Sequence, residues 1–197
     1  MPRTKEQFEE IRENRKQQIM EIAMTLFARD GYGHVSISML ANEAGISKGL
    51  MYNYFESKEQ LLREIIETSM HEISRYFDPN QDGVLTEAEF ILFIRKTFQL
   101  MKDEREYWMK FFSLIIQPNV LPILKNSSFL ISIDRFMGMF NDYFREHDFE
   151  DPALEMLNLA VIIEGLGMIM IFYQNVTEIP MDLLEKLENR IIKMYTK

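Results

Sequence analysis

Oxygen-bearing side chains recur at a regular spacing in one short segment of the chain. Asp78, Asn80 and Asp82 alternate with other residues, Gly83 follows them, and Glu89 closes the segment. Carboxylate and amide oxygens are hard ligands, which calcium prefers and most transition metals do not. The segment therefore predicts a calcium site. The predicted ligands are Asp78, Asn80, Asp82, the carbonyl of Val84, Thr86 directly or through a water, and both carboxylate oxygens of Glu89.

Residues 78–89 match the pattern D-x-[DN]-x-[DN]-G-x5-E at every specified position and resemble the loop of an EF-hand. A simpler interpretation is a tight turn followed by a capping box from Thr86 to Glu89. That interpretation leaves the three oxygen donors before Gly83 unexplained. EF-hands usually occur in pairs and no second loop is found, which lowers the expected affinity. A bound ion would either bias the orientation of the preceding domain or be purely structural.

Residues for covalent or acid–base catalysis are poorly represented. The chain has no cysteine, which excludes disulfides, thiol nucleophiles, zinc fingers and iron–sulfur clusters. Its three histidines, His34, His71 and His147, are scattered, and no nucleophile motif or phosphate-binding glycine loop is found. Carboxylate pairs could still meet in space. We expect a protein that is not an enzyme.

The elements that must position any site are all helical. Glycine and proline are scarce, at 8 and 6 of 197 residues, and they separate segments whose apolar residues recur every three or four positions. This pattern predicts an all-α fold, in one domain or two small ones. Helices are expected from near Glu6 to residue 30 and over 36–44, 47–54, 57–77, 87–103, 105–117, 127–147, 152–175 and 180–195.

The charge is unevenly distributed. The net charge is −9, yet residues 1–63 hold nine basic and nine acidic residues, so the whole excess lies in residues 64–197. The start of the chain lacks the apolar core of a signal peptide. The longest apolar run, Leu157 to Phe172, is interrupted by Glu164 and is shorter than the roughly 20 residues of a membrane-spanning helix. We expect a buried helix there, no membrane association and a cytoplasmic location.

The short helices at 36–44 and 47–54, joined through Gly45, have the dimensions of a helix-turn-helix. Many such pairs are only packing units, but the residue types are more specific. The segment at about 15–63 resembles the N-terminal domain of the TetR family of transcriptional regulators, with Leu40 and Met51 as minor departures. The matching positions are Ala23, Phe27, Gly31, Ser36, Ile37, Leu40, Ala41, Ala44, Gly45, Ser47, Gly49, Tyr52, Phe55, Lys58, Glu59 and Leu62.

This resemblance implies DNA binding, and the residues offer the chemistry for it. A small core of Ile37, Leu40, Ala41, Ala44, Leu50 and Phe55 would leave a polar face to enter a major groove. Lys48 suits a guanine edge and Asn53 an adenine edge. Hydroxyl and ammonium groups can donate to phosphate oxygens. At Gly49 the absence of a side chain lets the backbone approach them closely. The predicted DNA-binding residues are Ser36, Ser47, Lys48, Gly49, Tyr52, Asn53, Tyr54 and Lys58.

Each of these residues also has a structural alternative. The serines, including Ser57, would serve as helix caps, which at Ser36 is compatible with a phosphate contact. Tyr52 and Phe55 would pack in the core, and Lys58 would lie on a solvated face. His34 is expected at the surface or as a minor phosphate contact. The basic residues Arg3, Lys5, Arg12, Arg15 and Lys16 would add cations toward DNA or form a mobile arm.

Residues 57–197 are expected to form an effector-binding and dimerisation domain after a DNA-binding domain at 1–56. One helix-turn-helix reads few base pairs, so specificity ordinarily requires a two-fold dimer. By resemblance to the family, the helices within 152–195 would pack against those of a second subunit. A purely intramolecular core is the alternative. Glu164 would reach solvent, pair across the dimer or face a ligand.

Methionine and aromatic residues are frequent in the C-terminal part, with 15 Met and 15 Phe in the chain. They suit either a deformable apolar pocket or ordinary core packing. The family resemblance implies a pocket for a small apolar or amphipathic effector. The predicted ligand-binding residues are Met101, Trp108, Phe112, Phe136, Met137, Phe140, Met168 and Phe172.

The sequence as a whole predicts a ligand-responsive transcriptional regulator, usually a repressor in this family, that binds a palindromic operator as a homodimer. The effector would shift the helix at 57–77 and release the DNA. The alternative is a calcium-binding sensor or interaction protein in which the helix-turn-helix is only scaffold.

Overall fold

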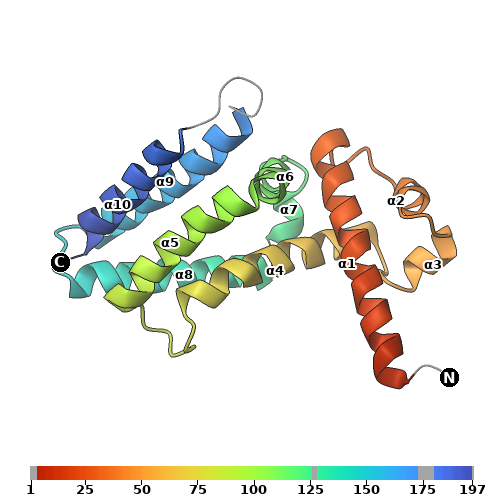
Figure 1. The fold of residues 1–197 in the computed structure, drawn as a ribbon, viewed down its shortest axis with the longest axis horizontal. Coiled ribbons are helices and arrows are strands. Elements are labelled where there is room, and N and C mark those ends of the chain that lie inside the picture. Colours follow the sequence, from red (N-terminus) through yellow and green to blue (C-terminus); the bar gives the residue numbers. More distant parts are fainter. Residues whose placement is uncertain (1–3, 126–127, 173–179, 197) are drawn as a thin grey trace. The chain divides into compact units, whose positions relative to one another are not determined.

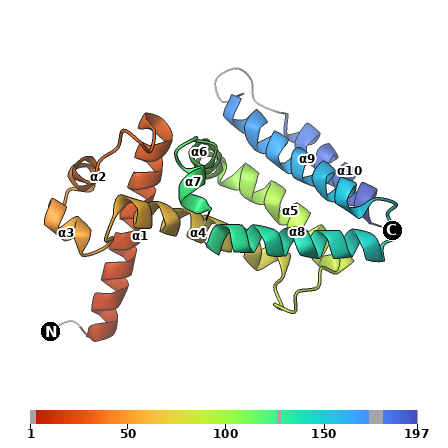
Figure 2. The same cartoon turned by 180° about the vertical axis from the view of Figure 1, so that it is seen from behind.

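The computed structural model describes residues 4–125, 128–172 and 180–196, all helical apart from the connections between helices (Figures 1 and 2). The described part contains no strand, which confirms the predicted all-α class. The helices are α1 (Lys5–Asp30), α2 (Ile37–Glu43), α3 (Lys48–Tyr52), α4 (Lys58–Phe77), α5 (Glu87–Asp103), α6 (Arg105–Ile115), α7 (Leu121–Leu124), α8 (Ser128–Glu146), α9 (Pro152–Phe172) and α10 (Met181–Tyr195).

The helices form two compact units, and the division falls inside α4 and α6. The first unit comprises residues 1–68 and 113–127, and the second comprises residues 69–112 and 128–197. Residues from far along the chain are therefore part of the N-terminal unit. The predicted boundary at residues 56 and 57 stays a prediction.

The first unit encloses a small apolar core. Leu40, Ala41, Ala44 and Phe55 are buried as predicted, but Leu50 is 40% exposed and Met51 takes the buried place. Successive residues of a helix point about 100° apart, so burying Met51 turns Leu50 outward. The prediction of Leu50 as a core residue was wrong.

The second unit is held together by aromatic rings from four helices. The Phe90 ring of α5 stacks on the Tyr143 ring of α8 at 5.0 Å between centroids, and Phe77 of α4 meets Phe136 edge-on at 4.5 Å. The Tyr143 hydroxyl donates to the carbonyl of Tyr195 at the end of α10, 2.7 Å away. These contacts make one core of α4, α5, α8 and α10.

Helix α9 does not have the buried surroundings that its composition predicts. Leu157 and Val161 are 56% and 59% exposed, and only 17% of residues 152–169 are buried. By length and composition this stretch could cross a membrane, a property that core helices of globular proteins share. Within the described chain, α9 therefore presents an uncovered apolar face.

Candidate nucleic-acid interface

The turn between α2 and α3 is built by local hydrogen bonds. Ser36 and Ser47 cap their helices, accepting from the backbone N–H of Met39 at 3.2 Å and of Leu50 at 3.1 Å. Gly45 has a φ of +64°. A residue with a side chain adopts this left-handed conformation only at a cost in free energy, and glycine adopts it without that cost. The predicted serine caps are confirmed, and the two short helices form the expected helix-turn-helix.

Much of α3 and its flanking residues is open to solvent. Ser47, Lys48, Gly49 and Asn53 are exposed, and Tyr52 is 47% exposed rather than packed in the core. A small residue, an ammonium group, a phenol and an amide are thus exposed within residues 47–53. These are groups that donate to base edges and phosphate oxygens. Tyr54 is only half exposed, and Ser36 is exposed at the start of α2.

Four of the basic residues near the start of the chain, Lys5, Arg12, Arg15 and Lys16, belong to α1 and not to a mobile arm. Arg12 donates to the backbone carbonyl of Asn53 at 3.1 Å, and Arg15 donates to that of Ala44. Lys16 pairs with Glu64 of α4. Their side chains therefore support α2, α3 and α4. Lys5 is exposed, and Arg3 lies outside the described residues.

Lys58 has an internal role that the sequence did not reveal. Its ammonium group donates to the backbone carbonyls of Tyr32 at 2.7 Å and Val35 at 2.8 Å, and it lies 4.2 Å from the centre of the Tyr32 ring. Burial lowers the pKa of this ammonium group. Lys58 thus ties the start of α4 to the segment between α1 and α2. A phosphate contact by Lys58 stays a prediction.

Gln117 is a positioning residue that the sequence analysis missed. Its amide N–H donates to the carbonyl of Phe27 at the end of α1 at 2.9 Å, and its amide oxygen accepts from the N–H of Tyr32 at 2.8 Å. Asn119 lies so close to Gly33 that an added Cβ would be 2.7 Å from the Asn119 amide nitrogen. The segment after α6 therefore fixes the turn that leads into the helix-turn-helix.

The predicted effector residues are not gathered around either of two cavities in the second unit. Met101, Trp108 and Phe140 are buried in packing, Met168 is 36% exposed, and the Phe172 side chain lies outside the described residues. Phe112 is packed against Gly167, and Met137 is half buried. Phe136 alone borders a cavity, one of about 450 Å³ beside Asp78. A pocket formed by all eight residues stays a prediction.

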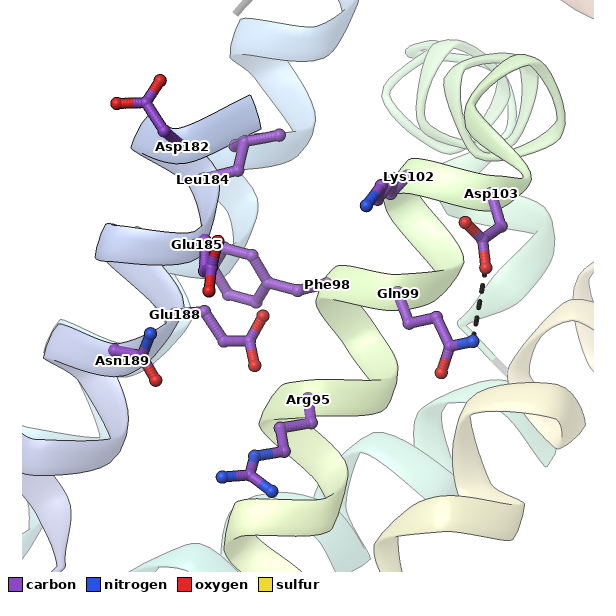
Figure 3. A pocket seen from close by; sticks show the side chains of 10 residues that line it. All are labelled: Arg95, Phe98, Gln99, Lys102, Asp103, Asp182, Leu184, Glu185, Glu188 and Asn189. Atoms are coloured by element: carbon purple, nitrogen blue, oxygen red, sulfur yellow. Dashed lines mark hydrogen bonds between the residues drawn. The ribbon is translucent and has the colours of Figure 1, made fainter. Parts of the chain in front are cut away.

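A larger cavity of about 760 Å³ lies between α5 and α10 (Figure 3). Arg95 and Lys102 of α5 face Glu185 and Glu188 of α10, with Phe98 and Leu184 as the apolar part of its lining. Burial raises the pKa of Glu188, whereas Arg95 acts in the opposite direction. This charged cavity is unlike the apolar pocket predicted from the sequence.

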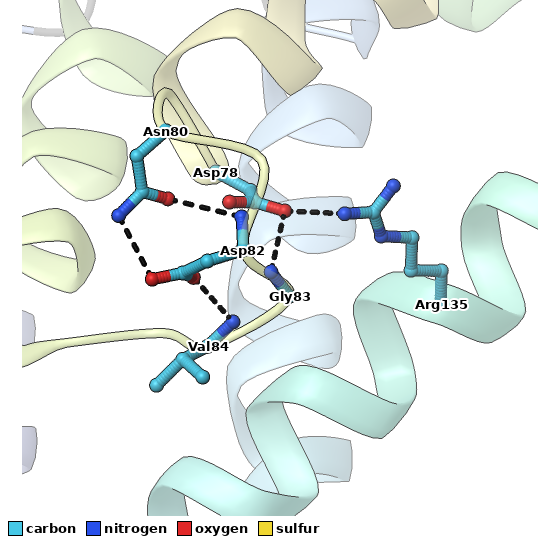
Figure 4. Close-up of polar contacts among 6 residues, drawn as sticks. All are labelled: Asp78, Asn80, Asp82, Gly83, Val84 and Arg135. Carbon is cyan, nitrogen blue, oxygen red and sulfur yellow. Dashed lines mark hydrogen bonds and ion pairs between the residues drawn. The ribbon is translucent and has the colours of Figure 1, made fainter.

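The residues of the predicted calcium loop are held by bonds to one another and to α8 (Figure 4). Asp78 pairs with Arg135 and accepts from the N–H of Gly83, and Glu89 accepts from Thr86 in the capping box. Val84 is exposed. Over the described ranges, no three His, Cys, Asp or Glu side chains are arranged to hold a metal ion. The turn and cap are thus present, and calcium binding stays a prediction.

Comparison with known proteins identifies the N-terminal segment. Residues 19–65 match the family described as "Bacterial regulatory proteins, tetR family". The chain is 31% identical over 96 residues to the HTH-type transcriptional regulator LuxR of Vibrio harveyi, covering 49% of this chain and 47% of LuxR. The chain thus spans about half the length of the curated relatives it matches.

Solved structures resemble the chain over most of its length. A TetR-like transcriptional regulator from Rhodococcus sp. RHA1 has a TM-score of 0.69 and 21% identity, covering 91% of this chain and 93% of that one. The regulator FadR from Bacillus subtilis in complex with stearoyl-CoA has a TM-score of 0.65 and 20% identity, covering 91% and 96%. These likenesses show the fold, an N-terminal helix-turn-helix followed by a helical domain.

The contacts of Gln117 lead to a prediction about the first unit. Gln117→Ala leaves the Tyr32 N–H without its acceptor and removes one donor from the Phe27 carbonyl, which keeps its bond from the Gly31 N–H. We expect it to lower the free energy of unfolding by roughly 1–3 kcal/mol. Urea denaturation measures this loss, and hydrogen exchange at the Tyr32 amide should accelerate. Exposed Gln17→Ala in the same unit is the matched control. Equal stability of the two variants would contradict the positioning role.

Proposed function

We propose that this chain, in which residues 19–65 form a TetR-family N-terminal domain, is a dimeric DNA-binding transcriptional regulator that acts as a repressor. The observation that carries the proposal is the exposed face of α3, with Lys48, Tyr52 and the cap residue Asn53 open to solvent while Met51 is buried beneath them. A helix-turn-helix that served only as a scaffold would not need to expose an ammonium group, a phenol and an amide on α3 and its cap residue Asn53.

The charge distribution supports this assignment. A body with a large acidic excess is repelled by phosphate, but residues 1–63 are balanced. Arg12, Arg15 and Lys16 bond within the unit, while Lys48 carries its charge into solvent. Lys48 is therefore the cation of this face best placed to approach DNA.

Binding to a duplex recovered by selection from a random pool tests the function. We expect the affinity to fall steeply with salt, because each phosphate contact releases counterions. Lys48→Ala should weaken binding roughly 5- to 150-fold, corresponding to about 1–3 kcal/mol for a base contact. Tyr52→Phe should weaken it less, because the ring is kept. Fluorescence anisotropy over a salt series measures these constants.

Lys193→Ala on exposed α10 is the matched control and should leave binding unchanged. If no duplex is selected, or if Lys48→Ala and Lys193→Ala bind alike, the proposed interface is wrong.

A homodimer through residues 152–195 is part of the proposal. Leu154, Leu157, Val161 and Met168 are exposed and recur at helical spacing along α9. A Cβ added at Gly165 would meet no heavy atom within 4 Å, so another helix could approach closely there. Exposed apolar stripes of this kind mark protein interfaces. Glu164 is exposed and continues the same spacing between Val161 and Met168, so it lies within the stripe, where a partner's basic group could pair with it.

Charge introduced into this stripe should prevent dimerisation. Leu157→Glu combined with Val161→Glu buries two carboxylates in a two-fold contact, and we expect at least a 100-fold weaker dimer. Light scattering over a dilution series gives the mass. Ile131→Glu, at a 73% exposed position of α8, is the matched control. A wild-type chain that stays monomeric, or a double variant as dimeric as the control, would contradict this interface.

The proposed effector is a small apolar or amphipathic molecule, with long-chain acyl-CoA as the first class to test. One protein with this fold, FadR of Bacillus subtilis, was solved in complex with stearoyl-CoA. In this chain, Trp108 is 3% exposed and its indole N–H has no hydrogen-bond partner among the described residues. A buried donor of this kind is stabilised when an acceptor reaches it.

Trp108 also reports on binding, because it is the single tryptophan of the chain. We expect stearoyl-CoA to change its fluorescence saturably and to weaken DNA binding at least tenfold, while CoA alone does neither. A saturable change with unaltered DNA affinity would separate binding from regulation. Absence of both effects would exclude this effector class.

The proposal includes a cytoplasmic location, where a bacterial regulator meets its DNA, and the absence of catalysis. The reported relatives are regulators, and the alternative hypothesis of a calcium sensor or interaction protein gains no support from them.

A further inference from the structure

The carboxyl group of Asp78 has one oxygen in use and one without a partner. Asp78 is 8% exposed; its Oδ2 accepts from the Gly83 N–H at 3.2 Å and pairs with Arg135 of α8. Oδ1 is buried and makes no hydrogen bond to the part of the chain that the structure describes. An unsatisfied charged oxygen is costly inside a protein. The site is therefore suited to a further ligand that offers positive charge.

The two oxygens of the Asp78 carboxyl face different sides, and Oδ2 is the one that pairs with Arg135. In Figure 4, Oδ1 lies on the side of the carboxyl away from Arg135, turned toward Asn80. Asn80 and Asp82 are themselves in contact, with Asn80 Nδ2 donating to Asp82 Oδ2 at 3.0 Å. On the other side, the cavity beside Asp78 is bordered by Arg75 and Arg135. An incoming cation would therefore enter the loop and not the cavity.

We propose that the loop at residues 78–89 binds one calcium ion through Asp78 Oδ1, and that Arg135 sets its affinity from the opposite side of the same carboxyl. Asn80, Asp82 and the Val84 carbonyl complete the near side of the site, and Glu89 closes it. All are hard oxygen donors, and flexible oxygen coordination favours calcium over magnesium. This proposal is independent of DNA binding.

Three hydrogen bonds must break for the ion to bind. Glu89 Oε2 accepts from the Thr86 N–H at 2.9 Å and from the Thr86 hydroxyl at 2.7 Å, so Glu89 must turn from the cap toward the ion. The amide of Asn80 must also release Asp82. The Asn80 oxygen keeps its bond from the Asp82 N–H at 3.2 Å, because a carbonyl oxygen has a second lone pair for the ion.

The frame of the loop stays in place while these side chains turn. Phe77 before the loop, Leu85 within it and Phe90 after it are at most 3% exposed and belong to the core of the second unit. Their burial fixes both ends of the loop. The required change is therefore limited to two polar side chains, those of Asn80, which is exposed, and of Glu89, which is 9% exposed.

Calorimetric titration of the chelator-treated full chain tests the proposal. We expect one calcium ion per chain, bound in the presence of excess magnesium. Asp78→Asn and Glu89→Gln should each weaken binding at least tenfold. Arg135→Gln should strengthen it severalfold, because it removes a positive charge from the shared carboxyl and leaves the loop donors intact. Asp142→Asn, an exposed aspartate of α8 outside the loop, is the matched control and should bind as the wild type does.

Loss of the Arg135 pair could unfold Asp78→Asn, so Asp82→Ala in the exposed part of the loop provides a second test. The Gly83 amide proton should also shift on calcium addition, because it is bonded to the Asp78 carboxyl. The proposal is overturned if the wild type binds no calcium, or if Asp82→Ala and Glu89→Gln bind it as tightly as Asp142→Asn. Weaker binding by Arg135→Gln would refute the role of Arg135.

Discussion

A helix as short as α3 cannot hold itself together, and the rest of the N-terminal unit follows from that constraint. Five residues, Lys48–Tyr52, fall far below the length at which an isolated helix is stable in water. The Ser47 cap supplies one hydrogen bond, and Met51, buried to 0% exposure, supplies the packing. With Met51 turned inward, α3 leaves the polar side chains of Lys48 and Tyr52 to solvent.

The supporting contacts come from residues that are far apart in the sequence. Arg12 of α1 reaches the Asn53 carbonyl at the end of α3, and Lys58 of α4 reaches the carbonyls of Tyr32 and Val35. Gln117 follows α6 in the sequence. Its side-chain oxygen accepts from the backbone N–H of Tyr32, which lies 85 residues earlier. The charges of Arg12 and Lys58 are thus used to fix the unit, which leaves the exposed Lys48 as the cation of the proposed DNA contact.

Local features of the fold could be predicted from the sequence. The helix bounds and the serine caps depend on residues three or four positions apart, and the predicted helix at residues 87–103 coincides with α5. Interactions between distant residues could not. No sequence pattern shows that Lys58 bonds to backbone carbonyls or that Gln117 joins the first unit. Leu50 and Met51 are adjacent apolar residues, and the core alone decides which of them is buried. The apolar composition of α9 predicted burial, but it does not specify whether the same chain or a partner covers the helix.

Hydrogen exchange with and without the selected duplex tests most directly whether α3 reads DNA. The account predicts that protection on binding is strongest at the amides of residues 47–53, weaker at the start of α2, and absent from α5 and α10. Protection centred on any other helix, with residues 47–53 unchanged, would contradict it.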